Sequence, residues 1–230
     1  MLSANPTTYS RHSTRASTPA GPELSYVDVP SSLYTRYGKR LFDLTVAAFV
    51  TVFVLSWMIP LIGLAICLTS RGPILFVQVR SGRNGRVFHC LKFRTMYHAP
   101  TAAFAQARKG DARITRIGAF LRRTNLDEMP QFWNVLMGDM SIVGPRPHAV
   151  QHDDLYWHTI QNYRSRYEVR PGITGLAQVR GARGETRELV NMKHRVQYDL
   201  LYVKKQSIGL DAKLCLGTVQ AMLKGNVNAW

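Results

Sequence analysis

An aspartate and a glutamate stand side by side in the stretch "NLDEMPQ", residues 125–131, of a chain that is otherwise strongly basic. Asp127 and Glu128 follow the arginine pair that begins at Arg122, and they precede Pro130. Neighbouring carboxylates among arginines can hold a divalent cation, and a carboxylate can also attack phosphorus directly. Magnesium is the natural cation here, because it binds through one or two carboxylates together with substrate phosphates.

The same two acids have a purely structural interpretation. Apolar residues recur at helical spacing before and after them, and Pro130 is tolerated only near a helix start, so we expect the helical run to break near residues 124–126. Asn125 would then cap the next helix, and Asn125-x-x-Glu128 has the spacing of a capping box, with both acids serving the helix dipole. From this stretch alone both interpretations stay open.

Further arginines stand on loops that proline makes stiff. "GPRP", residues 144–147, holds Arg146 between two prolines. "VRPGITG", residues 169–175, places Arg170 before a Pro-Gly pair that we expect at the centre of a type II turn. Arginines on stiff loops suit bidentate capture of phosphate, so these loops favour the chemical interpretation of the acid pair.

The stretch from residue 44 to residue 110 has no acidic residue. Within it, "ILFVQV", a turn at 82–86 and "VFHCLKF" predict a β-hairpin in which Lys92 and Arg94 share one face. Its basic residues either grip anionic lipid, at about 1 kcal/mol each, or, in the case of Lys92 and Arg94, face a phosphate-binding cleft. A membrane enzyme that handles a lipid phosphate needs both.

An uncharged segment runs from Leu44 to Leu68. As a helix it would reach roughly 37 Å, enough for the ~30 Å hydrocarbon core of a bilayer. Pro60 lies inside the segment and predicts a kink, and Lys and Arg residues flank it on both sides rather than on one. We therefore expect a re-entrant helix that bends at Pro60 and keeps both ends on the cytoplasmic face. A single span with a tolerated proline is the alternative.

Composition and the chain start set further limits. Lys and Arg outnumber Asp and Glu by 30 to 14, which predicts an anionic partner: nucleic acid, lipid headgroups or a phosphorylated substrate. Three widely spaced cysteines indicate no disulfide framework or metal site and fit a reducing cytoplasm. Because residues 1–32 have a Ser, Thr, Pro and Arg bias and no apolar core, we expect them to form a disordered tail and not a secretory signal.

Two other groups of polar residues are expected to be structural. The histidines, His148 among them, do not have the spacing of a metal site and are expected to be solvated or hydrogen-bonded. Asp153 and Asp154 are expected to face solvent.

Four motifs follow the proline-broken membrane segment in a fixed order. They are "GPILFVQVRSGRNGRVFHCLKFRTM", "LRRTNLDEMPQFWNVLMGDMSIVGPRP", "YEVRPGITGLAQVRG" and "YDLLYVKKQSIGLDAKLCLGTV". In this order the chain resembles the bacterial sugar transferases, the monotopic polyprenyl-phosphate phosphoglycosyl transferases, and in particular their exopolysaccharide-initiating branch. The resemblance covers nearly everything from Tyr37 onward. Asn125 departs from a frequent Ser, and Ile59 stands before Pro60 where a small polar residue is frequent.

The resemblance implies a two-step mechanism. Asp127 matches the nucleophile that attacks the sugar-linked phosphorus of a nucleotide diphosphate sugar and releases the nucleoside monophosphate. A polyprenyl phosphate then takes the phosphosugar from the carboxylate. Glu128 matches the neighbouring acid, which assists with Mg²⁺ and with proton transfer, so Asp127 and Glu128 form the implied metal site.

The resemblance also implies that Arg122 and Arg146 hold phosphate. Our own extrapolation adds Lys92, Arg94 and Arg170 to this phosphate-binding set.

The expected protein is α+β and helix-dominated. It has a tail (1–32), a proline-broken re-entrant membrane helix (33–70) and a single cytoplasmic catalytic domain with a small β-hairpin (71–230). The implied place is the cytoplasmic face of the bacterial inner membrane, where the partners are a nucleotide diphosphate sugar (UDP-glucose or UDP-galactose as a family-level guess), undecaprenyl phosphate and membrane lipid. Other polysaccharide-assembly proteins are further candidate partners, and nucleic acid is not expected. A non-catalytic basic binding or scaffold protein at the membrane is the alternative function.

Overall fold

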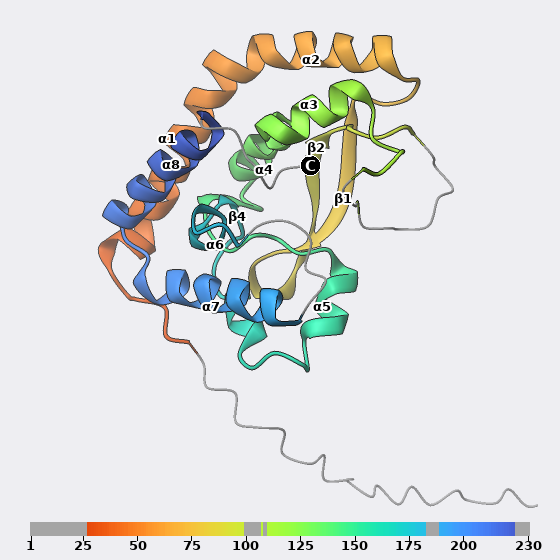
Figure 1. The fold of residues 1–230 in the computed structure, drawn as a ribbon. Coiled ribbons are helices and arrows are strands. Elements are labelled where there is room, and N and C mark those ends of the chain that lie inside the picture. The colour runs from red at the N-terminus through yellow and green to blue at the C-terminus, as the bar shows by residue number, and fades with distance from the viewer. Residues whose placement is uncertain (1–26, 99–106, 108–109, 183–188, 224–230) are drawn as a thin grey trace, which may run out of the picture.

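The computed structural model describes residues 27–98, 107, 110–182 and 189–223. Helices dominate this part of the chain, and its strands form two small two-stranded sheets (Figure 1). The predicted helix-dominated α+β class with a small β-hairpin is therefore confirmed. The predicted tail lies almost wholly outside the described residues.

The first helical run extends over 36 residues, from Tyr34 to Thr69, and by length and composition it could cross a membrane. It consists of η1 (Tyr34–Gly38), α1 (Lys39–Val50), η2 (Thr51–Leu55) and α2 (Ser56–Thr69). Figure 1 shows that the run changes direction between α1 and α2. The change coincides with η2, a π-helical segment in which the amide of Ser56 bonds to the carbonyl of Thr51.

Side chains supplement the backbone at this bend. Pro60 supplies no amide for the carbonyl of Ser56, four residues earlier. Upstream, the Ser56 hydroxyl donates to the Val52 carbonyl at 2.7 Å, and the Trp57 indole donates to the Phe53 carbonyl at 2.9 Å. Ile59 stands before Pro60 where the resemblance leads one to expect a small polar residue, but Ser56 supplies a hydroxyl one turn earlier.

The predicted hairpin forms from β1 (Leu75–Ser81) and β2 (Val87–Phe93), joined through η3 (Arg83–Gly85). Asn84 and Gly85 take the left-handed conformations, φ 56° and 73°, that a tight hairpin turn requires. The other edge of β2 is closed by a side chain: Asn134, fully buried, accepts from the Leu91 amide at 3.0 Å and donates to the His89 carbonyl at 2.8 Å. This pair of bonds ties the helix that follows the acid pair to the hairpin.

The remaining chain forms short elements and two long C-terminal helices. They are α3 (Arg116–Thr124), η4 (Leu126–Glu128), α4 (Gln131–Met137), β3 (Ser141–Val143), α5 (Val150–Tyr156), η5 (Tyr163–Tyr167), β4 (Gly172–Thr174), α6 (Leu176–Val179), α7 (Leu189–Lys205) and α8 (Ile208–Leu223). Strands β3 and β4 pair in parallel, with Ser141 opposite Gly172 and Val143 opposite Thr174.

The apolar helix is part of the fold's core rather than an appendage. α1 contributes Ala47 to the central cluster that contains Val135 and Tyr202, while Leu55 of η2 and Ile66 of α2 belong to a second cluster with α3. A third cluster gathers tyrosines of α5 and η5 against α7. α1 and α2 therefore pack against the rest of the fold while many of their large apolar side chains remain exposed.

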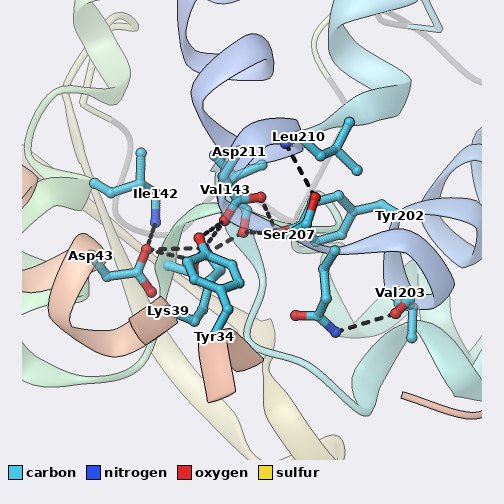
Figure 2. A network of polar contacts seen from close by, with 12 residues as sticks. Tyr34, Lys39, Asp43, Ile142, Val143, Tyr202, Val203, Ser207, Leu210 and Asp211 are labelled. Atoms are coloured by element: carbon cyan, nitrogen blue, oxygen red, sulfur yellow. Dashed lines mark hydrogen bonds and ion pairs between the residues drawn. The ribbon is translucent and has the colours of Figure 1, made fainter. Parts of the chain in front are cut away.

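A buried ion network joins the first helix to the last (Figure 2). Lys39 lies 3.1 Å from Asp43 on α1 and 3.0 Å from Asp211 on α8, and both carboxylates are almost fully buried. The hydroxyls of Tyr34 and Tyr202 also donate to Asp211, at 2.5 and 2.8 Å. An ammonium shared by two buried carboxylates makes the relative position of α1 and α8 specific, because moving either helix leaves a charge unpaired.

Candidate active site

The acid pair lies on η4, a single 3-10 turn between α3 and α4. Asn125 ends α3 in the left-handed region at φ 56°, a conformation that asparagine tolerates better than most residues. The predicted break near residues 124–126 is confirmed. The predicted capping box is wrong, because the Asn125 side chain makes no cap hydrogen bond and Glu128 binds charged side chains instead.

Glu128 is the acid that is held in place. Its Oε1 lies 2.6 Å from Lys92 Nζ and 2.6 Å from Arg146 Nη2, and its Oε2 accepts from Arg146 Nη1 at 3.1 Å. Burial by itself raises the pKa of Glu128, but the charges and hydrogen bonds of Arg146 and Lys92 outweigh it and keep the pKa well below its ordinary value. Glu128 therefore stays ionised and fixes both cations beside Asp127.

Asp127 is the acid that is left open. Its half-buried carboxylate makes no hydrogen bond or ion pair with the residues that the structure describes. Burial raises the pKa of Asp127 to about 6; the charge of Glu128 acts in the same direction, and those of Lys92, Arg122 and Arg146 act against it. A carboxylate whose charge is poorly stabilised, surrounded by cations, is suited to attack an anionic electrophile.

Arg122 is placed by the start of α3. The Thr115 hydroxyl caps this helix by accepting from the Gly118 amide at 2.9 Å. A Cβ on Gly118 would lie 2.0 Å from the Thr95 carbonyl oxygen, so only glycine lets α3 approach the chain after β2 so closely. In the last turn of α3, Arg122 Nε donates to the Thr95 hydroxyl at 2.9 Å. The negative charge of Asp127 acts on Arg122 and favours its charged form.

Backbone carbonyls hold the loop that carries Arg146. The Arg146 carbonyl accepts from Arg166 at 2.6 Å, and the Pro147 carbonyl accepts from Arg80 at 2.5 Å. The Pro145 carbonyl accepts from the Gly172 amide at 2.9 Å. Three successive residues of the "GPRP" stretch are thus fixed from outside the loop, which supports the prediction that Arg146 stands on a stiff loop.

The predicted type II turn at Pro171-Gly172 is wrong. That turn needs a positive φ at Gly172, whereas Gly172 lacks one and opens β4. Glycine is required for a different reason: a Cβ on Gly172 would lie 2.1 Å from the Gly144 amide nitrogen, and one on Gly175 would lie 2.2 Å from the Gly144 carbonyl oxygen. The two loops therefore touch backbone to backbone.

Two of the predicted phosphate-binding arginines lie elsewhere. Arg94 is buried and donates to the carbonyls of Ser70 and Arg71, at 2.7 and 2.9 Å, just beyond the end of α2. Arg170 Nε donates to the Gly138 carbonyl at 2.8 Å, beyond the end of α4. The expectation that Lys92 and Arg94 face one cleft is therefore wrong, because Arg94 serves the end of a helix.

The comparisons with known proteins bear directly on this site. A model of the family described as bacterial sugar transferase matches residues 34–225, which include every residue of the site. The chain belongs to the bacterial sugar transferase family. The family predicted from the ordered motifs is therefore confirmed.

Curated relatives of this family member carry related names. The chain is 45% identical over 208 residues to a UDP-glucose:undecaprenyl-phosphate glucose-1-phosphate transferase of Klebsiella pneumoniae, covering 90% of this chain and 44% of the relative. A protein of the same name from Caulobacter vibrioides is 47% identical over 186 residues, covering 80% and 69%. The exopolysaccharide production protein PSS of Rhizobium leguminosarum bv. phaseoli is 44% identical over 190 residues, covering 80% and 94%. The chain thus spans less than half of the Klebsiella relative and nearly all of the Rhizobium one.

The two predicted Mg²⁺ ligands, Asp127 and Glu128, differ in whether their oxygens are available to a metal ion. Within the described ranges, no three His, Cys, Asp or Glu side chains gather where they could hold a metal ion. Both oxygens of Glu128 are already bound to cations, so only Asp127 offers a carboxylate without rearrangement. One carboxylate together with diphosphate oxygens is a donor set that Mg²⁺ accepts.

A buried polar network behind the "GPRP" loop was not foreseen from the sequence. Asp153 is buried and accepts from the hydroxyls of Tyr163, at 2.7 Å, and Tyr167, so the expectation that Asp153 faces solvent is wrong. The side chain of Asp154 is not among those described. His148 is buried, with Nδ1 2.6 Å from Arg166 and from the Tyr163 hydroxyl, which confirms a hydrogen-bonded histidine. The four-residue spacing of the two tyrosines is the only sequence signal for this network.

Proposed function

We propose that this chain is a phosphoglycosyl transferase that moves a sugar-1-phosphate from a nucleotide diphosphate sugar to undecaprenyl phosphate through a covalent intermediate on Asp127. The observation that carries the proposal is the contrast within the acid pair. Glu128 is bound to Lys92 and Arg146, whereas Asp127 is unengaged and has a pKa raised to about 6. The printed names of the relatives support the same reaction class.

In the first step an oxygen of Asp127 forms a bond to the sugar-bearing phosphorus of the donor. The bond from that phosphorus to the bridging oxygen breaks, and its electron pair leaves with the nucleoside monophosphate. Lys92 and Arg146, fixed by Glu128, offset the negative charge of the diphosphate as the carboxylate approaches. Mg²⁺, when bound, adds Lewis-acid stabilisation of that charge.

In the second step a phosphate oxygen of undecaprenyl phosphate attacks the same phosphorus and releases the Asp127 carboxylate. The product is undecaprenyl diphosphate sugar, and the enzyme returns to its starting state. No proton must be transferred when the acceptor phosphate is a dianion. We assign Glu128 a positioning and electrostatic role, because its oxygens are committed to Lys92 and Arg146.

The proposed intermediate can be weighed. Purified protein is incubated with UDP-glucose or UDP-galactose in the absence of acceptor and then analysed by intact-mass spectrometry. We expect an added mass of one hexose phosphate on wild-type protein and on Asp28→Asn, which changes an exposed carboxylate outside the site. Asp127→Asn should show none. An adduct on Asp127→Asn, or transfer to lipid by that variant, would remove Asp127 from the mechanism.

The proposed place of this reaction is the cytoplasmic face of the inner membrane, with the helical run from Tyr34 to Thr69 re-entrant. The change of direction between α1 and α2 supports this topology. Single cysteines at the exposed positions Ser32 and Arg71 flank the run and test it. With the three native cysteines Cys67, Cys90 and Cys215 replaced by serine, a membrane-impermeant maleimide should label neither position in intact spheroplasts and both after lysis. Labelling of one end from outside would establish a single span instead.

A further inference from the structure

A polar hollow of about 330 Å³ lies where the end of α6 meets α7. The residues that line it include Arg180, Asn191, His194, Arg195 and Tyr198. Among the described residues of the lining are two arginines, further residues with hydrogen-bonding groups and one tyrosine, and none of these described residues is acidic. Such a wall suits an anion that carries a polar ring system.

Arg195 is the buried member of this lining, with 8% of its surface exposed. Its Nε donates to the Ala182 carbonyl at 3.2 Å. Burial lowers the pKa of Arg195 to about 10; the like charges of Arg146 and Arg166 act in the same direction, and Asp199 opposes them. An anion in the hollow would act on Arg195 in the same direction as Asp199 does.

The hollow is linked to the catalytic loop through a short chain of contacts. Asp199, one turn after Arg195 on α7, accepts from Arg166 Nη2 at 2.7 Å. The same Nη2 atom donates to the Arg146 carbonyl at 2.6 Å, and the Arg146 side chain binds Glu128. These hydrogen bonds connect α7, which carries Arg195, to the acid pair through Arg166 and Arg146.

The hollow lies on the side of the fold opposite to α2, which does not favour a lipid as its ligand. α2, the outer part of the apolar run, lies along one side of the molecule, and α7 lies on the opposite side (Figure 1). A polyprenyl chain would arrive from the side of α2. A soluble, anionic ligand with a ring system is the occupant that fits a polar hollow away from the apolar helix.

We propose that this hollow binds the nucleoside monophosphate half of the donor, with Arg195 as its buried anchor and Tyr198 beside the base or ribose. The inference rests on the proposed function and extends it to the leaving group. When the bond to the bridging oxygen breaks, the departing phosphate gains one negative charge, and Arg195 together with Arg146 stabilises it. The acid pair then keeps only the phosphosugar.

The test is a direct titration of purified wild-type protein with UMP, GMP and CMP by calorimetry, without sugar donor or acceptor. We expect one of these nucleotides to bind, and Arg195→Gln to weaken its binding by about tenfold to a hundredfold, as for loss of a hydrogen bond to a charged group. Lys193→Gln removes the same charge from an exposed position of α7 outside the hollow and should bind as wild type does. Inorganic phosphate should compete only weakly, because it lacks the base.

A second variant keeps the test decisive if Arg195→Gln does not fold. Asn191 and His194 are exposed at the rim of the hollow, so the pair Asn191→Ala and His194→Gln should fold and should bind the nucleotide about threefold to tenfold more weakly. In the transfer assay the same variants should raise the KM for the sugar donor and leave the KM for undecaprenyl phosphate unchanged.

The result that overturns the inference is nucleotide affinity within twofold of wild type in the hollow variants, or no binding of any of the three nucleotides to wild type. Failure of the proposed function looks different. In that case wild type forms no phosphosugar adduct, whatever its nucleotide affinity. Asp127→Asn should separate the two, because it abolishes the adduct and keeps the nucleotide site.

Discussion

Asp127→Asn removes one ionisable group and leaves the volume of the side chain almost unchanged. Wild-type Asp127 has no hydrogen-bond partner within the described part of the chain, so the substitution breaks no contact there. We expect the variant to lose sugar transfer and, above pH 6, to be more stable than wild type. The gain arises because folding places an ionised carboxylate where its charge is poorly stabilised.

The magnitude follows from the pKa. Burial raises the pKa of Asp127 to about 6. An exposed aspartate titrates near pH ~3.9, and each pH unit of difference corresponds to about 1.4 kcal/mol, so ionisation costs the folded state at most about 3 kcal/mol. Because the carboxylate is only half-buried, solvent screening reduces this figure, and a gain of about 1 to 2 kcal/mol is the realistic expectation.

The sign of the pH dependence is fixed by linkage. The folded protein holds the Asp127 proton more tightly than the unfolded chain does. The stability of wild type is therefore greatest below pH ~4, falls as the pH rises from ~4 to ~6, and is constant above that range as far as this group is concerned. Asparagine does not titrate. The advantage of the variant is thus absent near pH ~4 and complete above pH ~6.

Thermal unfolding in detergent micelles, from pH 4.5 to pH 8, measures this difference. For a chain of this size about 1 kcal/mol moves the Tm by roughly 2–4 °C, so a rise of about 2 to 8 °C is expected at pH 8 and about a third of that rise at pH 4.5. Asp28→Asn, at an exposed position, should follow wild type throughout. A variant that is less stable than wild type at pH 8, or a difference that does not change with pH, would refute the electrostatic reasoning.

Three further substitutions test other parts of the site. Glu128→Gln removes a negative charge that raises the pKa of Asp127. We therefore expect the acid limb of the pH–rate profile, measured on the residual transfer activity, to lie at lower pH than in wild type. An acid limb at the wild-type pH would contradict the electrostatic effect of Glu128 on Asp127. Gly172→Ala should destabilise the protein by about 3 kcal/mol, since its Cβ would lie 2.1 Å from a neighbouring amide nitrogen, whereas Gly209→Ala, with open space around it, should not lower the Tm. Arg166→Lys should weaken the hydrogen bond to the Arg146 carbonyl, which holds Arg146 in position. We expect this change to lower kcat by about tenfold and to move the acid limb of the pH–rate profile to higher pH. The surface variant Arg164→Lys should do neither, and a lower kcat with an unmoved limb would indicate a merely structural role.

The sequence was informative where one local signal decides the structure. Alternation and the Asn84-Gly85 pair predict the hairpin, because a tight turn with positive φ has few other solutions. The proline after the acid pair and the loss of periodicity predict the break between α3 and α4. In both cases the residues that predict the structure are close together in the sequence and lie in the element that they predict.

Prediction failed where a side chain's role depends on distant backbone. The sequence shows Arg94 and Arg170 as cations close to expected phosphate-binding motifs, but both bind backbone carbonyls of residues just beyond the end of a helix. Asp153 resembles a surface residue until η5 folds two tyrosine hydroxyls onto it. The hollow on α7 has no sequence signature, because Arg180 and Arg195 come together only when α6 packs on that helix.

The ammonium of Lys39, shared between Asp43 and Asp211, has a practical consequence for anyone seeking a detergent-free fragment. Cutting the chain after the apolar run would discard Lys39 and Tyr34 and leave the Asp211 carboxylate with only the Tyr202 hydroxyl among the side-chain partners described above. It would also strip Arg40 from the carbonyls of Val135 and Leu136 at the end of α4. Solubility is better sought by replacing the exposed apolar residues on the outer face of α2, such as Leu61, Leu64 and Leu68, than by truncation.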